Sequence, residues 1–285
     1  MKLSYYPGCS LEGTSLDYDK SVREICKKLD IELVDIPDWN CCGASSAHMT
    51  SHQVGIRLPI RNLRQAEGLG NDILVPCAAC FQRLRAADRE MRDNPEAWDT
   101  GGYGPESEII HISSFLARPE ILAKIREKVT HPLTDLPLAC YYGCLSLRHP
   151  HITGAPQWEM PVNLERIVEA IGAKPVNWSH RTECCSGSLT MARPDIAEKL
   201  VGDITTAARR GGAAAMVTDC PMCQANVESR QKNNGGDGGL PVFFATELIV
   251  AAIEGNYPKK QQKVHLVSPE VMTRHFDSTA TEDSV

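Results

Sequence analysis

Two short stretches decide the fold of this chain: DILVPCAAC at residues 72–80 and AAMVTDCPMC at residues 214–223. In each stretch, an apolar run of strand length leads directly into a Cys-x-x-C motif. Pro221, inside the second motif, suits the first turn of a helix. Each stretch therefore predicts a buried strand followed by a helix, with two thiols where the strand ends.

The two stretches belong to an internal repeat. Four cysteines of the first half recur in the second half, each displaced by 143 residues: Cys41, Cys42, Cys77 and Cys80 match Cys184, Cys185, Cys220 and Cys223. At this cysteine content, such a coincidence has a probability below about one per cent. A fifth pair, Cys9 and Cys144, follows a Tyr- and Gly-containing turn at an offset of 135. The second copy therefore holds eight extra residues, which we place in the Pro- and His-rich segment 149–161.

Strands and helices alternate in both copies. Helical apolar spacing, i, i+3, i+4, i+7, occurs at residues 22–29 and again at 164–171. Apolar runs predict strands at residues 2–6, 31–36 and 72–75, and at 138–142, 175–178 and 214–218. In open α/β folds, functional sites lie at the carboxyl ends of the strands, where these cysteines fall. We expect an α/β fold of two tandem, pseudo-symmetric domains, each with a small, mostly parallel sheet and flanking helices.

The domain boundary is expected near residues 130–136. The first domain, residues 1–133, includes a loop at 94–104 and a connecting helix at 113–129. The second domain, residues 134–285, includes a closing helix at 245–254. The Gly- and Asn-rich run 232–239 predicts a flexible loop, and the tail beyond Ser278 is expected to be disordered.

Composition limits the compartment and the partners. The 285 residues include 12 cysteines, and 30 basic residues face 36 acidic ones, for a net charge of −6. No clustered basic composition indicates a nucleic-acid partner. The N-terminus lacks a signal-like apolar core, and no apolar run reaches the ~18 residues of a membrane span. We therefore expect a cytoplasmic protein without a membrane span, in which dense cysteine indicates metal or redox chemistry rather than a disulfide scaffold.

The five repeated cysteines in each copy restrict which metal or redox centre the chain can hold. A thioredoxin-like pair needs two cysteines and would leave three of the five unexplained. Structural zinc and an ordinary [4Fe–4S] cubane each take four ligands. Adjacent cysteines such as Cys41 and Cys42 reach different irons of a larger cluster more readily than one small ion. Five thiolates thus favour an iron–sulfur assembly, with zinc and thiol redox chemistry as alternatives.

The spacing Cys-x31-Cys-Cys-x34-Cys-x2-Cys, repeated as Cys-x39-Cys-Cys-x34-Cys-x2-Cys, resembles the tandem CCG-domain pattern. Over nearly its whole length the chain resembles the B-type subunit family of heterodisulfide reductase. The resemblance implies a noncubane [4Fe–4S] cluster in each domain, held by two sets of five cysteines: Cys9, Cys41, Cys42, Cys77 and Cys80, and Cys144, Cys184, Cys185, Cys220 and Cys223. It also implies a disulfide substrate cleaved between the two clusters, each of which supplies one electron. The implied partners are a C-type subunit with cubane [4Fe–4S] clusters and an A-type flavoprotein subunit.

One position departs from the family pattern. The first copy reads Cys-Cys-Gly at residues 41–43, whereas the second reads Cys-Cys-Ser-Gly at residues 184–187. Glycine after a ligand permits positive φ or close backbone approach, so Ser186 sets the second site apart. We expect the second site to bind a cluster, with Gly187 as the residue that can take over the glycine's role.

For the candidate residues outside the two sets of five cysteines, a structural role is the first expectation. Cys26 lies on the apolar stripe of its helix, and Cys140 lies in a predicted strand, so both are expected in the core rather than as ligands. The pairs His48/His52 and His149/His151 are expected on a solvated helix face and in a loop, with metal binding and a substrate entrance as the alternatives. A local basic face is expected to be solvated, or else to dock an acidic partner or anionic substrate: Arg61, Arg64, Arg83, Arg85, Arg89 and Arg92.

Three functions therefore stand. The first is the catalytic B-type subunit of a heterodisulfide-reductase-like complex, an oxidoreductase acting on sulfur groups. The second is a B-type subunit of a related cytosolic complex that oxidises sulfur or serves another thiol-linked acceptor. The third is a zinc-stabilised interaction module without turnover.

Overall fold

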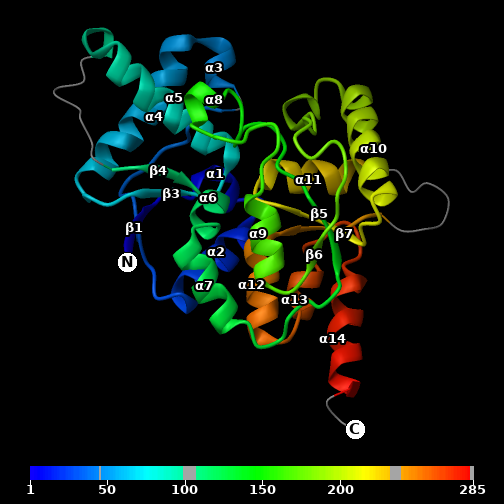
Figure 1. The fold of residues 1–285 in the computed structure, drawn as a ribbon. Coiled ribbons are helices and arrows are strands. Elements are labelled where there is room, and N and C mark those ends of the chain that lie inside the picture. The colour runs from blue at the N-terminus through cyan, green and yellow to red at the C-terminus, as the bar shows by residue number, and fades with distance from the viewer. Residues whose placement is uncertain (45, 99–106, 232–238, 283–285) are drawn as a thin grey trace.

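The computed structural model describes residues 1–44, 46–98, 107–231 and 239–282 (Figure 1). It contains two four-stranded parallel sheets, one in each half of the chain. The first has the order β2-β1-β3-β4 and the second the order β6-β5-β7-β8, so the two halves share one topology. The expected α/β fold with two parallel sheets is thus confirmed.

The strands of the first sheet are β1 (Lys2–Tyr5), β2 (Glu32–Asp35), β3 (Ile73–Val75) and β4 (Ile109–His111). Those of the second are β5 (Pro137–Cys140), β6 (Lys174–Pro175), β7 (Ala215–Thr218) and β8 (Val242–Phe244). In both sheets the strand that precedes Cys-x-x-C, β3 or β7, is central and fully buried. A strand buried on both faces must be apolar throughout, which explains the uninterrupted apolar runs.

The helices of the first half are α1 (Gly8–Leu11), α2 (Leu16–Lys28), α3 (Ala47–Thr50), α4 (His52–Glu67), α5 (Ala78–Asp93), α6 (Ile112–Leu116) and α7 (Pro119–Lys128), with a 3₁₀ turn, η1 (Pro95–Trp98). Those of the second half are α8 (Pro150–Thr153), α9 (Asn163–Ala170), α10 (Pro194–Arg210), α11 (Pro221–Arg230), α12 (Ala245–Glu254), α13 (Lys259–Gln262) and α14 (Glu270–Glu282), with a 3₁₀ turn, η2 (Gly187–Leu189).

The two halves pack through their helices. Helix α2 contacts α12, and α7 contacts α9, in the centre of the molecule (Figure 1). The Tyr18 ring stacks on Phe244 at 3.8 Å between centroids, and the hydroxyls of Ser21 and Thr246 lie 2.7 Å apart. One apolar cluster accordingly contains residues of both halves. The boundary at residue 133 stays a prediction, since the core is continuous there.

Several sequence predictions need correction. The helix expected at 113–129 is two helices, because Arg118 precedes Pro119 and adopts an extended conformation that separates α6 from α7. The strand expected at 175–178 is only Lys174–Pro175. The sequence does not predict the edge strands β4 and β8. Each has only three residues and continues directly into a helix, so the alternation that identifies a strand is too short to detect.

The C-terminal segment also differs from its prediction. Disorder was expected beyond Ser278, yet α14 continues to Glu282. The helix is tied to the core through Met272, which is fully buried, and through Val271 and Phe276, which pack against it. Residues 283–285 of the expected tail, 99–104 of the expected loop and 232–238 of the Gly-rich run lie outside the described residues.

A buried ion pair joins the C-terminal segment to the helix that begins at the second Cys-x-x-C. His265 Nδ1 lies 2.7 Å from Glu228 Oε1 on α11, and its Nε2 lies 3.2 Å from Glu247 Oε1 on α12. Burial disfavours the charged ring, but the hydrogen bonds with both carboxylates outweigh it and raise the pKa of His265 to about 10. The folded protein therefore holds an imidazolium where the unfolded chain would release a proton near its ordinary pKa of about 6.5.

This pair predicts a specific dependence of stability on pH. Because the folded-state pKa is raised, the contribution of His265 is fully present below pH ~6.5 and is lost as the pH rises through about 10. We expect His265→Gln to lower the free energy of unfolding by about 3–5 kcal/mol at pH 6, since two buried carboxylates lose their cation. The difference from the wild type should shrink steadily towards pH 10, as followed by denaturant unfolding with circular dichroism. His151→Gln, at an exposed position on α8, serves as the control, and a pH-independent difference would contradict the assignment.

Candidate functional site

Both Cys-x-x-C motifs lie where a central strand becomes a helix. Cys77 is the N-terminal capping residue of α5, with extended backbone angles of φ −83° and ψ 118°. Cys220 has the same place before α11, at φ −127° and ψ 118°, and Pro221 takes the first helical position as expected. Cys80 and Cys223 therefore lie in the first turn of their helices. The other repeated cysteines come from segments that follow the carboxyl ends of neighbouring strands, so parallel strands gather all of them at one edge of each sheet.

The repeated cysteines approach one another in both halves. In the first, Cys42 Sγ lies 3.3 Å from Cys80 Sγ, and Cys41 Sγ lies 3.9 Å from Cys9 Sγ. In the second, Cys185 Sγ lies 3.6 Å from Cys223 Sγ. All twelve cysteines are free thiols. Among the described residues, no three His, Cys, Asp or Glu side chains are grouped so as to hold a single metal ion.

A cavity of about 120 Å³ marks the second site. All five repeated cysteines of the second half line it: Cys144, Cys184, Cys185, Cys220 and Cys223. Its volume is several times the ~30 Å³ that one water molecule occupies in the liquid. The rest of the wall is mostly apolar, with Leu145 and Met222 among its residues. Five soft sulfur donors around a largely apolar space of this size fit a polynuclear iron–sulfur group.

The first half of the chain contributes to the second site. Ala78, which lies between Cys77 and Cys80, lines the same cavity and packs in the apolar cluster that contains Cys220 and Cys223. The first Cys-x-x-C motif thus forms part of the wall around the second set of cysteines. The two sites are consequently adjacent across the contact between the halves.

Glycine allows the backbone to approach the cysteines in both halves. Gly8 and Gly143 precede Cys9 and Cys144 and adopt positive φ angles of 72° and 65°. A Cβ atom on Gly8 would lie 2.7 Å from the sulfur of Cys80, and one on Gly143 would lie 2.8 Å from that of Cys223. Any side chain here would displace a sulfur atom, so both the φ angle and the contact require glycine.

Several thiols are poised to ionise. Hydrogen bonds with the thiols of Cys41 and Cys80 lower the pKa of Cys42 to about 4, assisted by the positive charge of Arg83. In the second half, a hydrogen bond with Cys144 lowers the pKa of Cys184 to about 6, assisted by Arg148. Thiolates are the form in which cysteine binds metals. Each site thus contains a thiolate at neutral pH and an arginine whose charge favours it.

The hydroxyl of Tyr18 connects the two Cys-x-x-C motifs. It lies 3.3 Å from the carbonyl oxygen of Pro76 and 3.1 Å from that of Asp219, the residues directly before Cys77 and Cys220. The buried ring of His111, at the end of β4, faces the carboxylate of Asp219 at 3.5 Å. Tyr18, His111 and Asp219 were not identified from the sequence. Tyr18 and Asp219 are 201 residues apart in the sequence, so no local sequence pattern indicates their contact.

The two cysteines outside the repeated sets lie in the core, whereas His48 and His52 lie on separate helices. Cys26 is 1% exposed and burial raises its pKa to about 12, and Cys140 is fully buried, as expected for core residues. His48 and His52 do not share a helix, because α3 ends before Ser51, whose side chain caps α4. The expected common helix face for this pair is therefore wrong.

The eight-residue expansion forms more than a loop. It contains the short helix α8, which packs on α5 of the first half, and both His149 and His151 are exposed. Arg85 and Arg89 of α5 donate hydrogen bonds to the carbonyl oxygens of residues 152 and 151. The predicted single basic face is thus divided, since these arginines attach the expansion while Arg61 and Arg64 lie on α4.

This geometry defines a class: a duplicated α/β protein with a five-cysteine site at the carboxyl edge of each parallel sheet. The model of the CCG cysteine-rich domain matches residues 3–85 and again residues 138–228. The chain belongs to this family, and each half carries one copy of the domain.

Known relatives match most of the length of the chain. It is 30% identical over 263 residues to the 8-methylmenaquinol:fumarate reductase membrane anchor subunit of Wolinella succinogenes, covering 88% of this chain and 92% of that protein. It is 27% identical to the B-type subunit of the ferredoxin/F420H2-dependent CoB-CoM heterodisulfide reductase of Methanosarcina acetivorans, covering 88% and 89% of the two chains. A protein of Archaeoglobus profundus, described as like the B-type subunit of heterodisulfide reductase, is 26% identical over 91% of this chain and 93% of that one.

A solved structure supports the fold alone. The crystal structure of a hypothetical protein from Helicobacter pylori superposes with a TM-score of 0.68 at 12% identity. The match covers 94% of this chain and 52% of that one, so this chain corresponds to about half of that structure. No helix in the described part of this chain has both the length and the apolar character needed to cross a membrane.

The turns after the two cysteine pairs differ in one residue, Gly43 in the first and Ser186 in the second. Exchanging these residues is expected to change the stability of the protein in opposite directions. Gly43 has φ 76°, and a Cβ there would lie 2.8 Å from the Cβ of Ala47, whereas Ser186 has φ 65° and carries its side chain in the turn. The Ser186 hydroxyl is buried without a hydrogen-bond partner among the described residues. Both backbone N–H groups donate to the first cysteine of their pair, at 3.4 Å for Cys41 and 3.3 Å for Cys184. The serine itself thus reproduces the glycine turn, and the expectation that Gly187 takes over this role is wrong, because Gly187 has no positive φ angle.

We expect Gly43→Ser to lower the free energy of unfolding by about 1–3 kcal/mol, because the added side chain meets packed atoms. Ser186→Gly should raise it by about 1 kcal/mol, because it removes a strained φ angle and an unpartnered hydroxyl. Thermal unfolding of the two variants checks the signs. Equal changes in both would show that the two turns do not differ in packing.

Proposed function

We propose that this protein is the B-type subunit of a heterodisulfide-reductase-like complex, in which a disulfide is cleaved, or formed, between two noncubane [4Fe–4S] clusters. The observation that carries the proposal is the cavity whose wall contains all five repeated cysteines of the second half. The names of the Methanosarcina and Archaeoglobus relatives support it. Iron–sulfur clusters transfer single electrons, whereas breaking one S–S bond into two thiols takes two electrons and two protons.

The residues take the following roles in the proposal. Ten cysteines hold the two clusters, in the sets of five described above, and Gly8 and Gly143 give the space for them. Ala78, Leu145 and Met222 form an apolar wall that excludes water from the second site. Tyr18 fixes the two Cys-x-x-C motifs relative to each other, so that two one-electron centres lie on either side of one substrate.

The partners and the compartment belong to the same proposal. Electrons would come from an A-type flavoprotein through a C-type subunit with cubane clusters, in the cytoplasm. The substrate is a disulfide or a pair of thiols.

A second function is favoured by the Wolinella relative, whose name is that of a subunit of 8-methylmenaquinol:fumarate reductase. In that case the same clusters relay electrons inside a complex whose chemistry takes place on another subunit. Oxidation of sulfur compounds, the reverse direction, uses the same site. A zinc-stabilised module is the alternative without redox chemistry.

Metal analysis of anaerobically purified protein tests the cluster assignment. We expect about eight iron and eight sulfide per chain, from two clusters of four irons each. Cys80→Ala and Cys223→Ala should each remove about half of the iron. Cys26→Ala and Cys140→Ala, at buried cysteines outside the two sets, are matched controls that should keep all of it. About two zinc ions per chain without iron would exclude both redox functions.

Electron paramagnetic resonance separates the enzyme from the relay. With clusters intact, oxidation in the presence of a thiol should give a paramagnetic species that is absent without thiol, because a substrate sulfur then binds at the cluster. The Cys223→Ala variant should lose this signal. Intact clusters that give the same spectrum with and without thiol would favour the relay.

A further inference from the structure

A groove on the surface adjoins the second cysteine site. It has a volume of about 220 Å³ and lies where α1 of the first half contacts α11 of the second. Two of its lining residues, Gly187 and Met222, also line the cavity that contains the five repeated cysteines. A Cβ atom on Gly187 would lie 3.6 Å from Cε of Met222 and 3.5 Å from the sulfur of Cys185. The groove and the cysteine cavity therefore share one wall.

The groove also reaches the first cysteine site. Ser10, which lines it, directly follows Cys9, one of the exposed cysteines. At its other side the groove is lined by Met222, which directly precedes Cys223. A molecule bound in the groove would thus lie beside cysteines of both sets. Under the function proposed above, that molecule is the thiol or disulfide substrate, and the inference rests on that function for the sulfur chemistry.

The size of the groove fits part of a small molecule. Its volume of about 220 Å³ equals that of about seven water molecules at ~30 Å³ each. Together with the adjoining cysteine cavity of about 120 Å³, the space reaches the ~300 Å³ at which typical small-molecule sites begin. A substrate with its sulfur in the cysteine cavity can therefore place its remaining atoms, here called the tail, in the groove.

The lining of the groove is polar but uncharged. Its side chains carry hydroxyl, amide and apolar groups, and none of those within the described part of the chain is ionisable. The hydroxyls of Ser10 and Thr14 form no hydrogen bond to another described residue, so both can bind a ligand. Pro221, Met222 and Ala225 of α11 give the groove an apolar side that suits a carbon chain.

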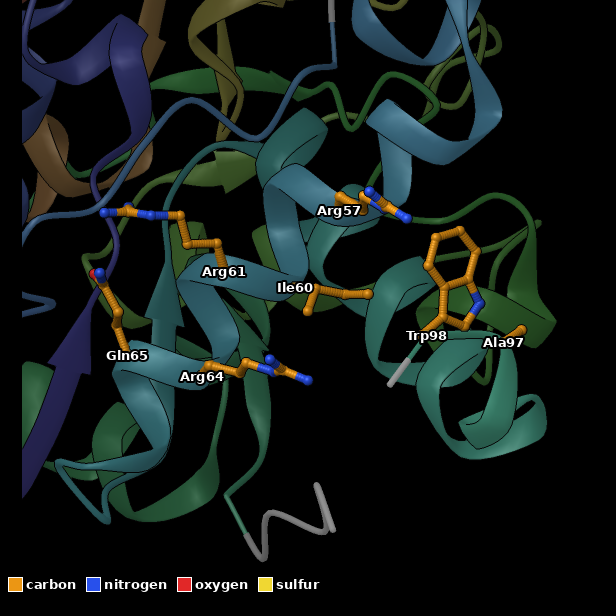
Figure 2. Close-up of a pocket in the computed structure, with 7 residues that line it drawn as sticks. All are labelled: Arg57, Ile60, Arg61, Arg64, Gln65, Ala97 and Trp98. Carbon is orange, nitrogen blue, oxygen red and sulfur yellow. The ribbon is translucent and has the colours of Figure 1, made fainter. Parts of the chain in front are cut away.

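The basic residue of α11 is already engaged. Arg230 Nη2 donates to the carbonyl oxygen of Thr190 at 2.8 Å, and Nη1 lies 3.9 Å from the carboxylate of Glu198. Arginines do line a cavity between α4 and η1, but no cysteine lines that cavity, and its Arg61 is paired with Asp38 (Figure 2). A carboxylate or phosphate in the groove would therefore lose water without gaining a counter-charge, whereas a hydroxyl or amide would exchange one hydrogen bond for another.

We propose that the groove between α1, α11 and η2 binds an uncharged, amide- or hydroxyl-bearing tail of the thiol or disulfide whose sulfur enters the second cysteine cavity. Ser10 and Thr14 form hydrogen bonds with the polar end of the tail, and the apolar side of α11 contacts its carbon chain. The substrate class is thus a neutral polar thiol, and an anionic tail is disfavoured.

Two isosteric thioethers test the charge preference of the groove. The probes 3-(methylthio)propionamide and 3-(methylthio)propionate differ in the charge of the end group, and neither contains a thiol or an S–S bond. Binding to the anaerobically purified full chain is measured by isothermal titration calorimetry at pH 7. We expect the amide to bind at least about fivefold more tightly than the carboxylate, because only the carboxylate is desolvated as an ion.

A lysine introduced into the groove should change this preference. Ala225→Lys places a cation at an exposed position of α11 that lines the groove, and it should abolish or reverse the preference for the amide. Ala123→Lys, at an exposed position of α7, adds the same charge outside the groove and should keep the preference of the wild type. Circular dichroism confirms that both variants are folded.

Four results would overturn the proposal: equal binding of the two probes, tighter binding of the carboxylate, no binding of either probe, or the same change of preference in both lysine variants. The thiol-dependent paramagnetic species reports separately on the proposed function. A chain that prefers the amide but lacks that species would refute the disulfide chemistry and leave the selectivity of the groove standing. A chain that gives the species without the preference would refute the groove and leave the proposed function standing.

Discussion

The phenolic hydroxyl of Tyr18 provides the contact on which the relation between the two cysteine sites depends. It lies within hydrogen-bond distance of two carbonyl oxygens, each one residue before a Cys-x-x-C motif. A phenol has one proton, so the two acceptors share a single donor. Burial makes the arrangement costly to break, because a buried carbonyl that loses its partner is left desolvated without compensation. Stacking of Tyr18 on Phe244 fixes the ring, and the halves are thereby held with the ends of their central strands at a common interface.

The pseudo-symmetry around this contact is incomplete, and the differences make each half depend on the other. Ala78 of the first half closes the cavity of the second, and the expansion of the second half, through α8, packs on α5 of the first. Gly43 and Ser186 occupy equivalent turns, yet only the first is forced to be glycine by its neighbours. If the two copies were structurally independent, neither half would contribute residues to the site or the packing of the other. The unit that forms a complete site is therefore the pair of domains.

The sequence predicts what is repeated and local, and misses what is single and distant. The constant cysteine offset, the apolar strands and the Cys-x-x-C turns follow from short patterns, and the structure has two sheets of the same order as that repeat requires. The fourth strand of each sheet has three residues and merges with the helix after it, so no period separates them. Tyr18, His111 and Asp219 form their contacts only when the halves pack.

The surroundings of the two sites suit different tasks. The first site has two exposed cysteines, Cys9 and Cys41, and the second site has one, Cys184. The second surrounds a largely apolar cavity that Ala78 of the first half helps to line, and a lower dielectric there strengthens charge–charge interactions. An electron donor needs an accessible surface with complementary charge, whereas a bond-breaking step gains from seclusion. Under the function proposed above, electrons would therefore enter at the first site, and the contact through Tyr18 would keep the second site close enough for both to act on one substrate.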